Sequence, residues 1–425
     1  MVEYKETVLK RIEPILRDFF EYFNKRKFIP GKTKVNVGWP LFDEKEMLHV
    51  ISSFLDMQIS QGPAVLEFEK KFAEYQGVKY AVAVNSGSSA NLLSLSTFME
   101  ANEAKPGDEV IVPAATFATV ASPIIQLGLV PVFVDVEQNT YNIDPEEIKK
   151  AIGPATKIIM PVHSLGNPAN MPEIMDIAKK HDLNVLEDFC ESHGAILNGK
   201  KVGSFSDMST LSFFVAHNIT TGDGGMIFTN NPLYDKLLRS MREFGRFNEP
   251  GTERFEYKDK FLGNYDLRYV FQHLGFNVRM TDLCASIGIE QLKKLDKLND
   301  ERIKICNYYI KNLKQYERWV QLPESLSNSK HTYYAFPLLI KKDAPFSRIE
   351  IIQFLEEHNI ETRFFFGGCL PDQPAFRDKQ IKVIGNLRVS RCIRDSAFFI
   401  GCHPGLEGEG KEYVINMLKK FFAQY

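Results

Sequence analysis

Short apolar runs that alternate with amphipathic stretches constrain the fold of this chain more than any other feature. The runs YAVAV, EVIVP, VPVFV, KIIMP and NVLED are rich in Val and Ile, and most precede a segment whose apolar residues recur at helical spacing, such as MPEIMDIAKKH. Strands separated by helices of this length pair in parallel, and helices cover both faces of their sheet. The sequence therefore predicts an α/β fold built on a large, mostly parallel sheet.

The pattern changes at both ends of this α/β region. Residues 1–27 have apolar positions at helical spacing, and the chain becomes helical again after residue 281 before strand and helix patterns mix. A chain of 425 residues also exceeds what one simple core usually holds. We therefore predict a helical extension over residues 1–40, a large α/β domain over residues 41–290 and a smaller C-terminal α+β domain over residues 291–425.

Composition narrows the class of protein. Lys and Arg total 52 and Asp and Glu total 54, a formal charge of −2, which excludes a strongly basic nucleic-acid binder. Charges interrupt every apolar run near the N-terminus, so we expect neither a signal peptide nor a membrane span. Six cysteines without a CxxC motif argue against a zinc ribbon or a disulfide framework. We expect a cytoplasmic enzyme or binding protein that binds neither nucleic acid nor membrane.

A small polar loop follows the first apolar run and precedes a helical pattern. It reads Asn85-Ser86-Gly87-Ser88-Ser89. Small residues let the backbone approach an anion, hydroxyl groups donate hydrogen bonds, and the N-terminus of the next helix supplies oriented N–H groups. The loop is therefore a candidate phosphate site. The same residues are also typical of a tight turn that only caps a helix.

Two further polar segments end or follow apolar runs. Asp188 ends the run NVLED, at the edge where parallel sheets bind ligands. If buried, it needs a cationic partner such as a protonated pyridine nitrogen, unless it only caps the next turn. The other segment runs from Ser212 to Gly225 and holds one imidazole, His217. A lone histidine is usually structural or lies on the surface.

In this order, the three segments resemble the DegT/DnrJ/EryC1/StrS sugar aminotransferase family of fold-type I pyridoxal-phosphate enzymes. The segment GFNVRMTD at residues 275–282 is similar to the family's G-Y-N-x-R-M-T-E motif, and the resemblance extends from about residue 40 to the C-terminus. It implies a homodimer with the active site at the subunit interface. Asn277 would then reach the cofactor phosphate of a neighbouring subunit.

The resemblance also implies the contacts of a bound pyridoxal or pyridoxamine 5'-phosphate within one subunit. Ser88, Ser89 and Ser212 would hold the phosphate. Phe117, in the segment AATF, would stack on the ring. Asp188 would pair with the pyridine nitrogen.

One position departs from the family. Five residues after Ser212 the family has the lysine that forms a Schiff base with the cofactor, and this chain has His217 there. Lys200 and Lys201 belong to a hairpin-like NGKKVG segment and offer no replacement. The same substitution marks the NDP-4-keto-6-deoxyhexose 3-dehydratase branch of the family, and Glu191 in DFCES also resembles that branch.

The branch implies C3 dehydration in deoxysugar or polysaccharide biosynthesis rather than transamination. Pyridoxamine phosphate would condense with a sugar C4 ketone, and its ring would accept the charge left when a base removes a proton. The C3 hydroxyl leaves once it is protonated. Histidine exchanges protons near neutral pH in both directions, so we expect His217 to be the acid–base catalyst.

The branch contains two kinds of enzyme. One holds an iron–sulfur cluster and receives electrons from a reductase, and the N-terminal segment FIPG resembles this kind. The other has no cluster and uses L-glutamate to regenerate pyridoxamine phosphate. The cysteine-rich insert of the first kind corresponds here to FNEPGTER, which lacks cysteine, and only Cys190 lies where a fourth ligand could be. Because such clusters need four mostly cysteine ligands, the sequence favours glutamate and no metal.

The substrate contacts and some alternative functions stay open. Candidates for binding a nucleotide diphosphate or a glutamate carboxylate are Arg246, Arg254, Arg279, Arg363 and His403. A GDP-, CDP- or dTDP-sugar would fit equally. The alternatives are an aminotransferase-like enzyme without the lysine, a reductase-dependent iron–sulfur enzyme and a non-catalytic nucleotide-sugar-binding homologue.

Overall fold

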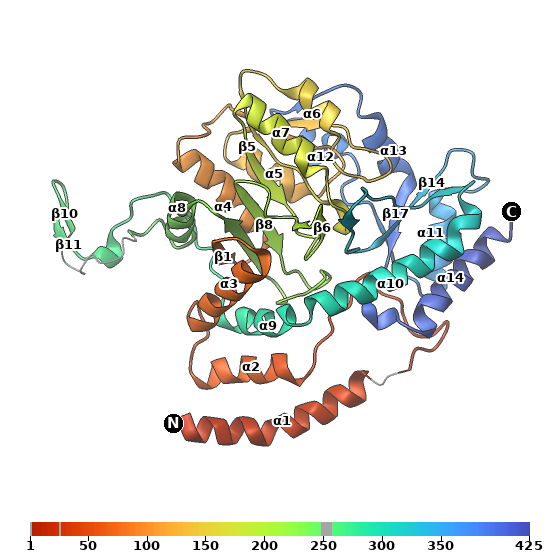
Figure 1. Cartoon of the computed structure of the whole chain (residues 1–425), viewed down its shortest axis with the longest axis horizontal. Coiled ribbons are helices and arrows are strands. Elements are labelled where there is room, and N and C mark those ends of the chain that lie inside the picture. Colours follow the sequence, from red (N-terminus) through yellow and green to blue (C-terminus); the bar gives the residue numbers. More distant parts are fainter. Residues whose placement is uncertain (1, 25–26, 248–256) are drawn as a thin grey trace.

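A helical N-terminal segment precedes the main sheet. The structure, a computed structural model, describes residues 2–24, 27–247 and 257–425. The first helix, α1 (Val2–Asn24), lies along α2 (Glu44–Leu55) at one side of the molecule (Figure 1). It confirms the helical pattern predicted there. The next helix, α3 (Pro63–Gln76), ends at Gly77, whose positive φ of 75° suits the left-handed cap of a helix.

Eight strands form the central sheet, in the order β1-β9-β8-β5-β4-β2-β3-β16. Their bounds are β1 (Tyr80–Val84), β2 (Glu109–Pro113), β3 (Val130–Val134), β4 (Thr156–Ile159), β5 (Asn184–Asp188), β8 (Met208–Ser212), β9 (Gly225–Thr229) and β16 (Lys382–Val383). All neighbouring pairs from β8 to β16 are parallel, whereas β9 is antiparallel to β1 and β8. The predicted α/β fold with a mostly parallel sheet is confirmed.

Helices cover both faces of this sheet. Successive side chains of a strand point to opposite faces, so Val82 packs with one group of helices and Ala83 with another. The first group is α4 (Gly87–Glu100), α5 (Ala118–Gln126) and α8 (Pro232–Arg242). The opposite face is covered by α3, α6 (Pro145–Ala151), α7 (Met171–His181) and α9 (Asp282–Leu292).

A smaller antiparallel sheet lies in the C-terminal part. It contains β12 (Val320–Gln321), β14 (Phe336–Ile340), β17 (Ala397–Ile400) and β15 (Thr362–Phe364), in that order. One face packs on α10 (Leu295–Leu313), α11 (Arg348–Glu357) and α14 (Glu409–Phe422). Phe399, on the other face, packs with Ala115 and Leu165 of the large domain. Two contacts cross the predicted domain boundaries: β16, from the C-terminal part, pairs with β3 of the central sheet, and Val35, from the N-terminal part, packs in the C-terminal core. The domain limits at residues 40 and 290 therefore stay a proposal.

The remaining elements are short. A hairpin of β6 (Ile196–Leu197) and β7 (Lys200–Lys201) pairs with β13 (Ser329–Lys330), which confirms the hairpin predicted for NGKKVG. The helices α12 (Pro374–Arg377) and α13 (Arg388–Ser396) lie near the C-terminus. A two-stranded arm, β10 (Tyr257–Asp259) and β11 (Gly263–Tyr265), projects far from the body (Figure 1). Across the described residues, no helix combines the length and apolar character needed to span a membrane.

Candidate active site

A cavity of about 1090 Å³ opens at the carboxyl ends of the parallel strands. The loops that follow β1, β2, β5 and β8 form one wall, and the connector Asn36 to Pro40 and the C-terminal domain form the other. This is the edge where open α/β sheets bind ligands. The predicted site residues that line it are Ser88, Phe117, Asp188, Glu191, Ser212 and His217.

The loop after β1 combines helix capping with an open polar face. Ser86 caps α4, since its Oγ accepts a hydrogen bond from the Ser89 N–H at 3.1 Å. A Cβ atom added to Gly87 would lie 2.6 Å from the Cβ of Ser212, so only glycine allows the two segments to approach this closely. Ser88 is exposed and lines the cavity, whereas Ser89 is absent from the lining and bonds to Ser86. Capping thus accounts for Ser86 and Ser89, and Ser88 stays available for a ligand.

Asp188 is a buried carboxylate that has hydrogen bonds but no cation. It is 4% exposed; its Oδ2 accepts from Asn91 Nδ2 at 2.9 Å and its Oδ1 from the Cys190 N–H at 3.0 Å. No lysine or arginine of the described chain forms an ion pair with it. Thr210 Oγ1 donates to Asn91 Oδ1 at 2.6 Å and thereby orients the amide. A buried anion of this kind suits a protonated ring nitrogen, so Asp188 fits the cofactor.

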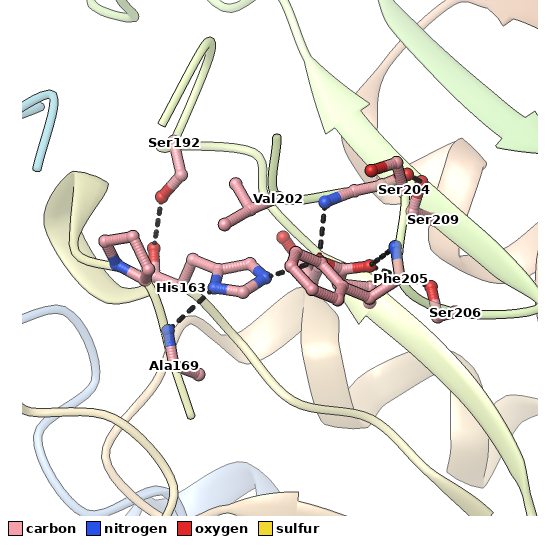
Figure 2. Close-up of polar contacts among 12 residues, drawn as sticks. His163, Ala169, Ser192, Val202, Ser204, Phe205, Ser206 and Ser209 are labelled. Carbon is pink, nitrogen blue, oxygen red and sulfur yellow. Dashed lines mark hydrogen bonds and ion pairs between the residues drawn. The ribbon is translucent and has the colours of Figure 1, made fainter. Parts of the chain in front are cut away.

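Glu187, the neighbour of Asp188 in β5, points to the other face of the sheet, where it accepts hydrogen bonds from buried groups beneath the site. Its Oε1 accepts from His163 Nε2 at 2.9 Å, and both side chains are fully buried. His163 Nδ1 in turn accepts from the Ala169 N–H at 2.9 Å, which requires that Nε2 carries the proton that Glu187 accepts. Figure 2 shows His163 between Ala169 and the loop that contains Phe205.

The Glu187 carboxylate also fixes the turn at residues 203–206. It accepts hydrogen bonds from the N–H groups of Gly203 and Phe205 and, at 2.9 Å, from Ser206 Oγ. On the other side, Ser192 Oγ donates to the His163 carbonyl at 2.7 Å (Figure 2). The His163 N–H also donates to the Asp188 carbonyl at 3.0 Å. Glu187 and His163 therefore fix the backbone that carries Asp188.

Phe117 and Glu191 occupy opposite kinds of environment in the cavity. Phe117 is the N-cap residue of α5 and is 56% exposed, so a ligand in the cavity can stack on its ring. Glu191 Oε2 accepts from the Leu165 N–H at 2.9 Å. Burial, with a smaller contribution from the Asp188 charge, raises the pKa of Glu191 to about 8. Glu191 is therefore mostly protonated at neutral pH.

His217 lies in the turn after β8. Its Nδ1 is 2.9 Å from the Ser212 carbonyl oxygen, so Nδ1 carries the proton of the neutral ring and Nε2 has the free lone pair. The rings of Tyr334 and Phe214 flank it, with centroids 5.3 and 6.0 Å away. Burial lowers the pKa of His217 to about 4, opposed by the Ser212 carbonyl and reinforced by Arg302. The imidazole is thus an uncharged base at neutral pH.

No lysine of the described residues lines the cavity. Lys201 Nζ donates to the Tyr75 carbonyl and lies 3.6 Å from the Tyr75 ring centroid, and Lys200 lies over Phe205. Neither residue is among those that line the cavity. Among the described residues, the two lysines of the NGKKVG segment therefore lie outside the cavity that holds His217.

The other candidates have mixed positions. Arg363 lines the cavity, whereas Arg246 and Arg279 both pair with Glu243, at 2.8 and 3.3 Å, and lie outside it. His403 is buried and also lies outside the lining, and Arg254 falls outside the described residues.

Asn277 is exposed and absent from the lining; its Oδ1 accepts from Arg279 Nε. Within the described chain, no cluster of three or more His, Cys, Asp or Glu side chains could hold a metal ion.

Sequence reasoning missed three residues of the site. Asn91 holds Asp188, Trp39 of the connector lines the cavity and Tyr334 flanks His217. Only Asn91 gave a usable signal, because it lies one helical turn after Ser88 in α4.

The sequence of this chain is similar to those of known proteins. The sequence matches the DegT/DnrJ/EryC1/StrS aminotransferase family over residues 41–419. It is 36% identical to dTDP-4-dehydro-2,6-dideoxy-D-glucose 3-dehydratase of Saccharopolyspora spinosa, over 97% of this chain and 92% of that protein. It is 34% identical to GDP-4-keto-6-deoxy-D-mannose 3-dehydratase of Yersinia pseudotuberculosis, over 91% of this chain and 100% of that protein.

A solved structure agrees with these relatives. GDP-4-keto-6-deoxymannose-3-dehydratase with a trapped PLP–glutamate geminal diamine superimposes with a TM-score of 0.83 and 31% identity, over 90% of this chain and 100% of that one. The chain therefore belongs to the DegT/DnrJ/EryC1/StrS aminotransferase family and has the fold of fold-type I pyridoxal-phosphate enzymes.

Proposed function

We propose that this chain catalyses C3 dehydration of a nucleotide-linked 4-keto-6-deoxyhexose with pyridoxamine and pyridoxal 5'-phosphate as cofactor forms. One observation carries the proposal: His217, and no lysine, lies in a described cavity that also holds Asp188, Phe117, Ser88 and Ser212. An imidazole can act as a base but cannot form the Schiff base that a lysine amine forms with the cofactor. The names of the two relatives, both 3-dehydratases, support the substrate class.

The cavity residues fit the proposed cofactor. Asp188 would hold the ring nitrogen, Phe117 would stack on the ring, and Ser88 and Ser212 would bind the phosphate. Ser89 would support the phosphate loop through its bond to Ser86. When bound, the cofactor supplies an amino group for the sugar ketone and a ring that delocalises negative charge.

His217 would perform the proton transfers. Because the Ser212 carbonyl fixes the tautomer, Nε2 is the atom that would take a proton near the sugar C4 and deliver one to the departing C3 hydroxyl. Glu191, neutral at pH 7, would face the cofactor as a hydrogen-bond donor.

L-Glutamate would close the catalytic cycle. Over one turnover the C3 hydroxyl is replaced by hydrogen, and glutamate becomes 2-oxoglutarate with release of ammonia, so glutamate supplies both electrons. The glutamate adduct of the related dehydratase supports this choice. So does the sequence FNEPGTER, which lacks the cysteines an iron–sulfur cluster requires.

We further propose a cytoplasmic homodimer with its active sites at the interface. Three carboxylates, the mostly protonated Glu191 and one arginine, Arg363, line the described cavity, although both substrate and cofactor carry phosphates. Phe261, in the projecting arm, is 84% exposed, and Leu274, in the segment that follows the arm, is 92% exposed; a partner subunit would cover both side chains. Asn277 and the arginines beside it would then reach the partner's phosphates. The six free cysteines support a reducing compartment.

The test is incubation with pyridoxamine phosphate, glutamate and a panel of GDP-, CDP- and dTDP-4-keto-6-deoxyhexoses, with products identified by mass. We expect loss of the C3 oxygen from at least one sugar and none with His217→Asn. Gain of an amino group would instead indicate an aminotransferase. Tight nucleotide-sugar binding without turnover would indicate a non-catalytic homologue.

The electron source needs its own measurement. We expect repeated turnover only when glutamate is present, and no stoichiometric iron after anaerobic purification. Turnover that requires a reductase and ignores glutamate would refute this part of the proposal and make Cys190 a ligand candidate.

A further inference from the structure

A buried arginine that pairs with no carboxylate of the described residues lies beside the His217 backbone. Arg302, in α10, is 1% exposed and is among the largest fully buried side chains. Its Nη1 donates to the Tyr334 carbonyl at 3.0 Å and to the Tyr333 carbonyl at 3.4 Å, and its Nη2 lies 3.5 Å from the His217 carbonyl. No carboxylate of the described residues pairs with it, and its Nε has no hydrogen-bond partner there. It also contacts the buried Cys402 thiol, whose Sγ donates to the Tyr333 carbonyl at 3.4 Å.

Two other arginines that are largely buried differ from Arg302 because they pair with carboxylates. Arg242 is also buried, at 3% exposure, but it pairs with Glu69 at 2.5 Å. Arg239 pairs with the same carboxylate at 2.8 Å and with Asp235 at 2.9 Å. Burying a cation without an anion is costly, and carbonyl oxygens compensate only part of the lost hydration. A neutral side chain could make similar bonds to carbonyls, so the charge itself calls for an explanation.

Two titratable groups whose rings lie beside His217 are neutral, whereas Arg302, beside the His217 backbone, carries a charge. His193, from the loop after β5, has its ring centroid 5.8 Å away and is fully buried, and burial holds its pKa well below the usual value. Burial also raises the pKa of the Tyr334 phenol, so both groups are neutral at pH 7. The other charged or titratable groups on the cavity side are Asp188, Cys190, Glu191, Asp223, Glu361 and Arg363.

We propose that Arg302 is a positioning residue for the catalytic base: it ties the His217 turn to α10 and adds to burial in keeping the imidazole uncharged, with Nε2 free to accept a proton. This inference rests on the proposed function of His217. A cation behind the ring disfavours the imidazolium form, and Nδ1 is already bonded to the Ser212 carbonyl. Arg302 is suited to this role because a guanidinium keeps its charge when buried, whereas an ammonium can lose its proton.

The test measures the titration of His217 in the free protein, by NMR of ring-labelled histidine, with the His217 signal assigned by its loss in His217→Asn. In Arg302→Gln we expect the His217 midpoint to rise by about one pH unit, a ten-fold gain in proton affinity. Arg302→Met, which fills the space without a polar group, should give the same rise and serves if the Gln variant does not fold. Arg242→Gln removes a different buried arginine and should leave the midpoint unchanged.

The outcomes separate charge from structure. If the His217 midpoint is the same in both Arg302 variants as in the parent protein, the proposal is overturned, even if activity falls. If Arg242→Gln raises the midpoint equally, general loosening explains the effect and the proposal also fails. Because the titration needs no substrate, a raised midpoint in a protein that dehydrates no sugar would refute the proposed function alone. In an active enzyme, the acidic limb of the kcat profile should move with the midpoint.

Discussion

Replacing Glu187 should show how much the buried network beneath the site contributes to stability. In Glu187→Ala, His163 Nε2–H and the Gly203 N–H lose their acceptor while both residues stay buried. Each unsatisfied buried donor costs about 1–3 kcal/mol, and breaking a buried pair costs about 3–5 kcal/mol. We therefore expect the free energy of unfolding to fall by about 3–5 kcal/mol, a large share of the stability of an ordinary domain.

Urea denaturation measures this loss directly, with the free energy extrapolated to water. Glu67→Ala is a matched control, because Glu67 is 47% exposed and pairs only with Lys71 on the surface of α3. Such pairs contribute about 1 kcal/mol or less. Glu187→Gln keeps the side-chain volume and separates lost hydrogen bonds from an empty cavity.

The same variant should also weaken cofactor binding, since the His163 N–H and the Asp188 carbonyl are bonded to each other. Titration with pyridoxal phosphate, followed by absorbance and without denaturant, would measure this loss of cofactor affinity in the folded protein. A stability change in Glu187→Ala no larger than that of Glu67→Ala would refute the reasoning, because the four hydrogen bonds would then contribute nothing beyond a surface ion pair.

Three further outcomes follow from the site. Asp188→Asn should weaken binding of pyridoxal phosphate, measured by absorbance titration, with little change in the free energy of unfolding, since no described cation depends on that charge; unchanged affinity would contradict its role. For Glu191, burial raises the pKa to about 8, so the folded protein holds a proton that the unfolded chain releases near pH 4.5. This stabilisation is complete below pH 4.5 and is lost as the pH rises to 8. Glu191→Gln should therefore flatten the fall in urea stability between pH 7 and 8, and an identical slope would exclude the shift. His217→Lys should yield a borohydride-stable pyridoxal phosphate adduct by intact mass, where the parent protein yields none; an adduct on the parent would contradict the non-covalent mode.

The sequence predicted the central sheet because its signal is local. Strand and helix periodicity can be read within windows of about 10 to 15 residues, and the apolar runs from YAVAV to NVLED became β1 to β5. The two-residue strand β16 could not be predicted, since Lys382 and Val383 pair with β3 some 250 residues away and carry no periodic pattern. The antiparallel direction of β9 could not be predicted either, because the direction in which a strand pairs depends on tertiary packing and not on local sequence.

Much of the site was also predictable, because residues at the ends of parallel strands meet at one edge. From the sequence we assigned Asp188 to the cofactor and gave no role to Glu187, although strand alternation places the two side chains on opposite faces. One supports the backbone through His163, and the other lies at the cavity. Arg302 was missed because its contact with the His217 carbonyl joins residues 85 positions apart and depends on how α10 docks against the turn after β8.

The exchange of lysine for His217 changes what the rest of the cavity must do. A lysine would add a cation and a covalent bond to the cofactor, whereas a neutral imidazole adds neither. Retention then depends on Asp188, on ring stacking and on phosphate contacts, yet among the described lining residues only Arg363 is cationic. The N-terminus of α4 supplies part of the missing positive potential. The remainder has to come from outside the subunit's own cavity, and the arginines beside Asn277 lie outside it, paired with Glu243. Cofactor retention and subunit assembly are therefore, in the mechanism we propose, two requirements of the same site.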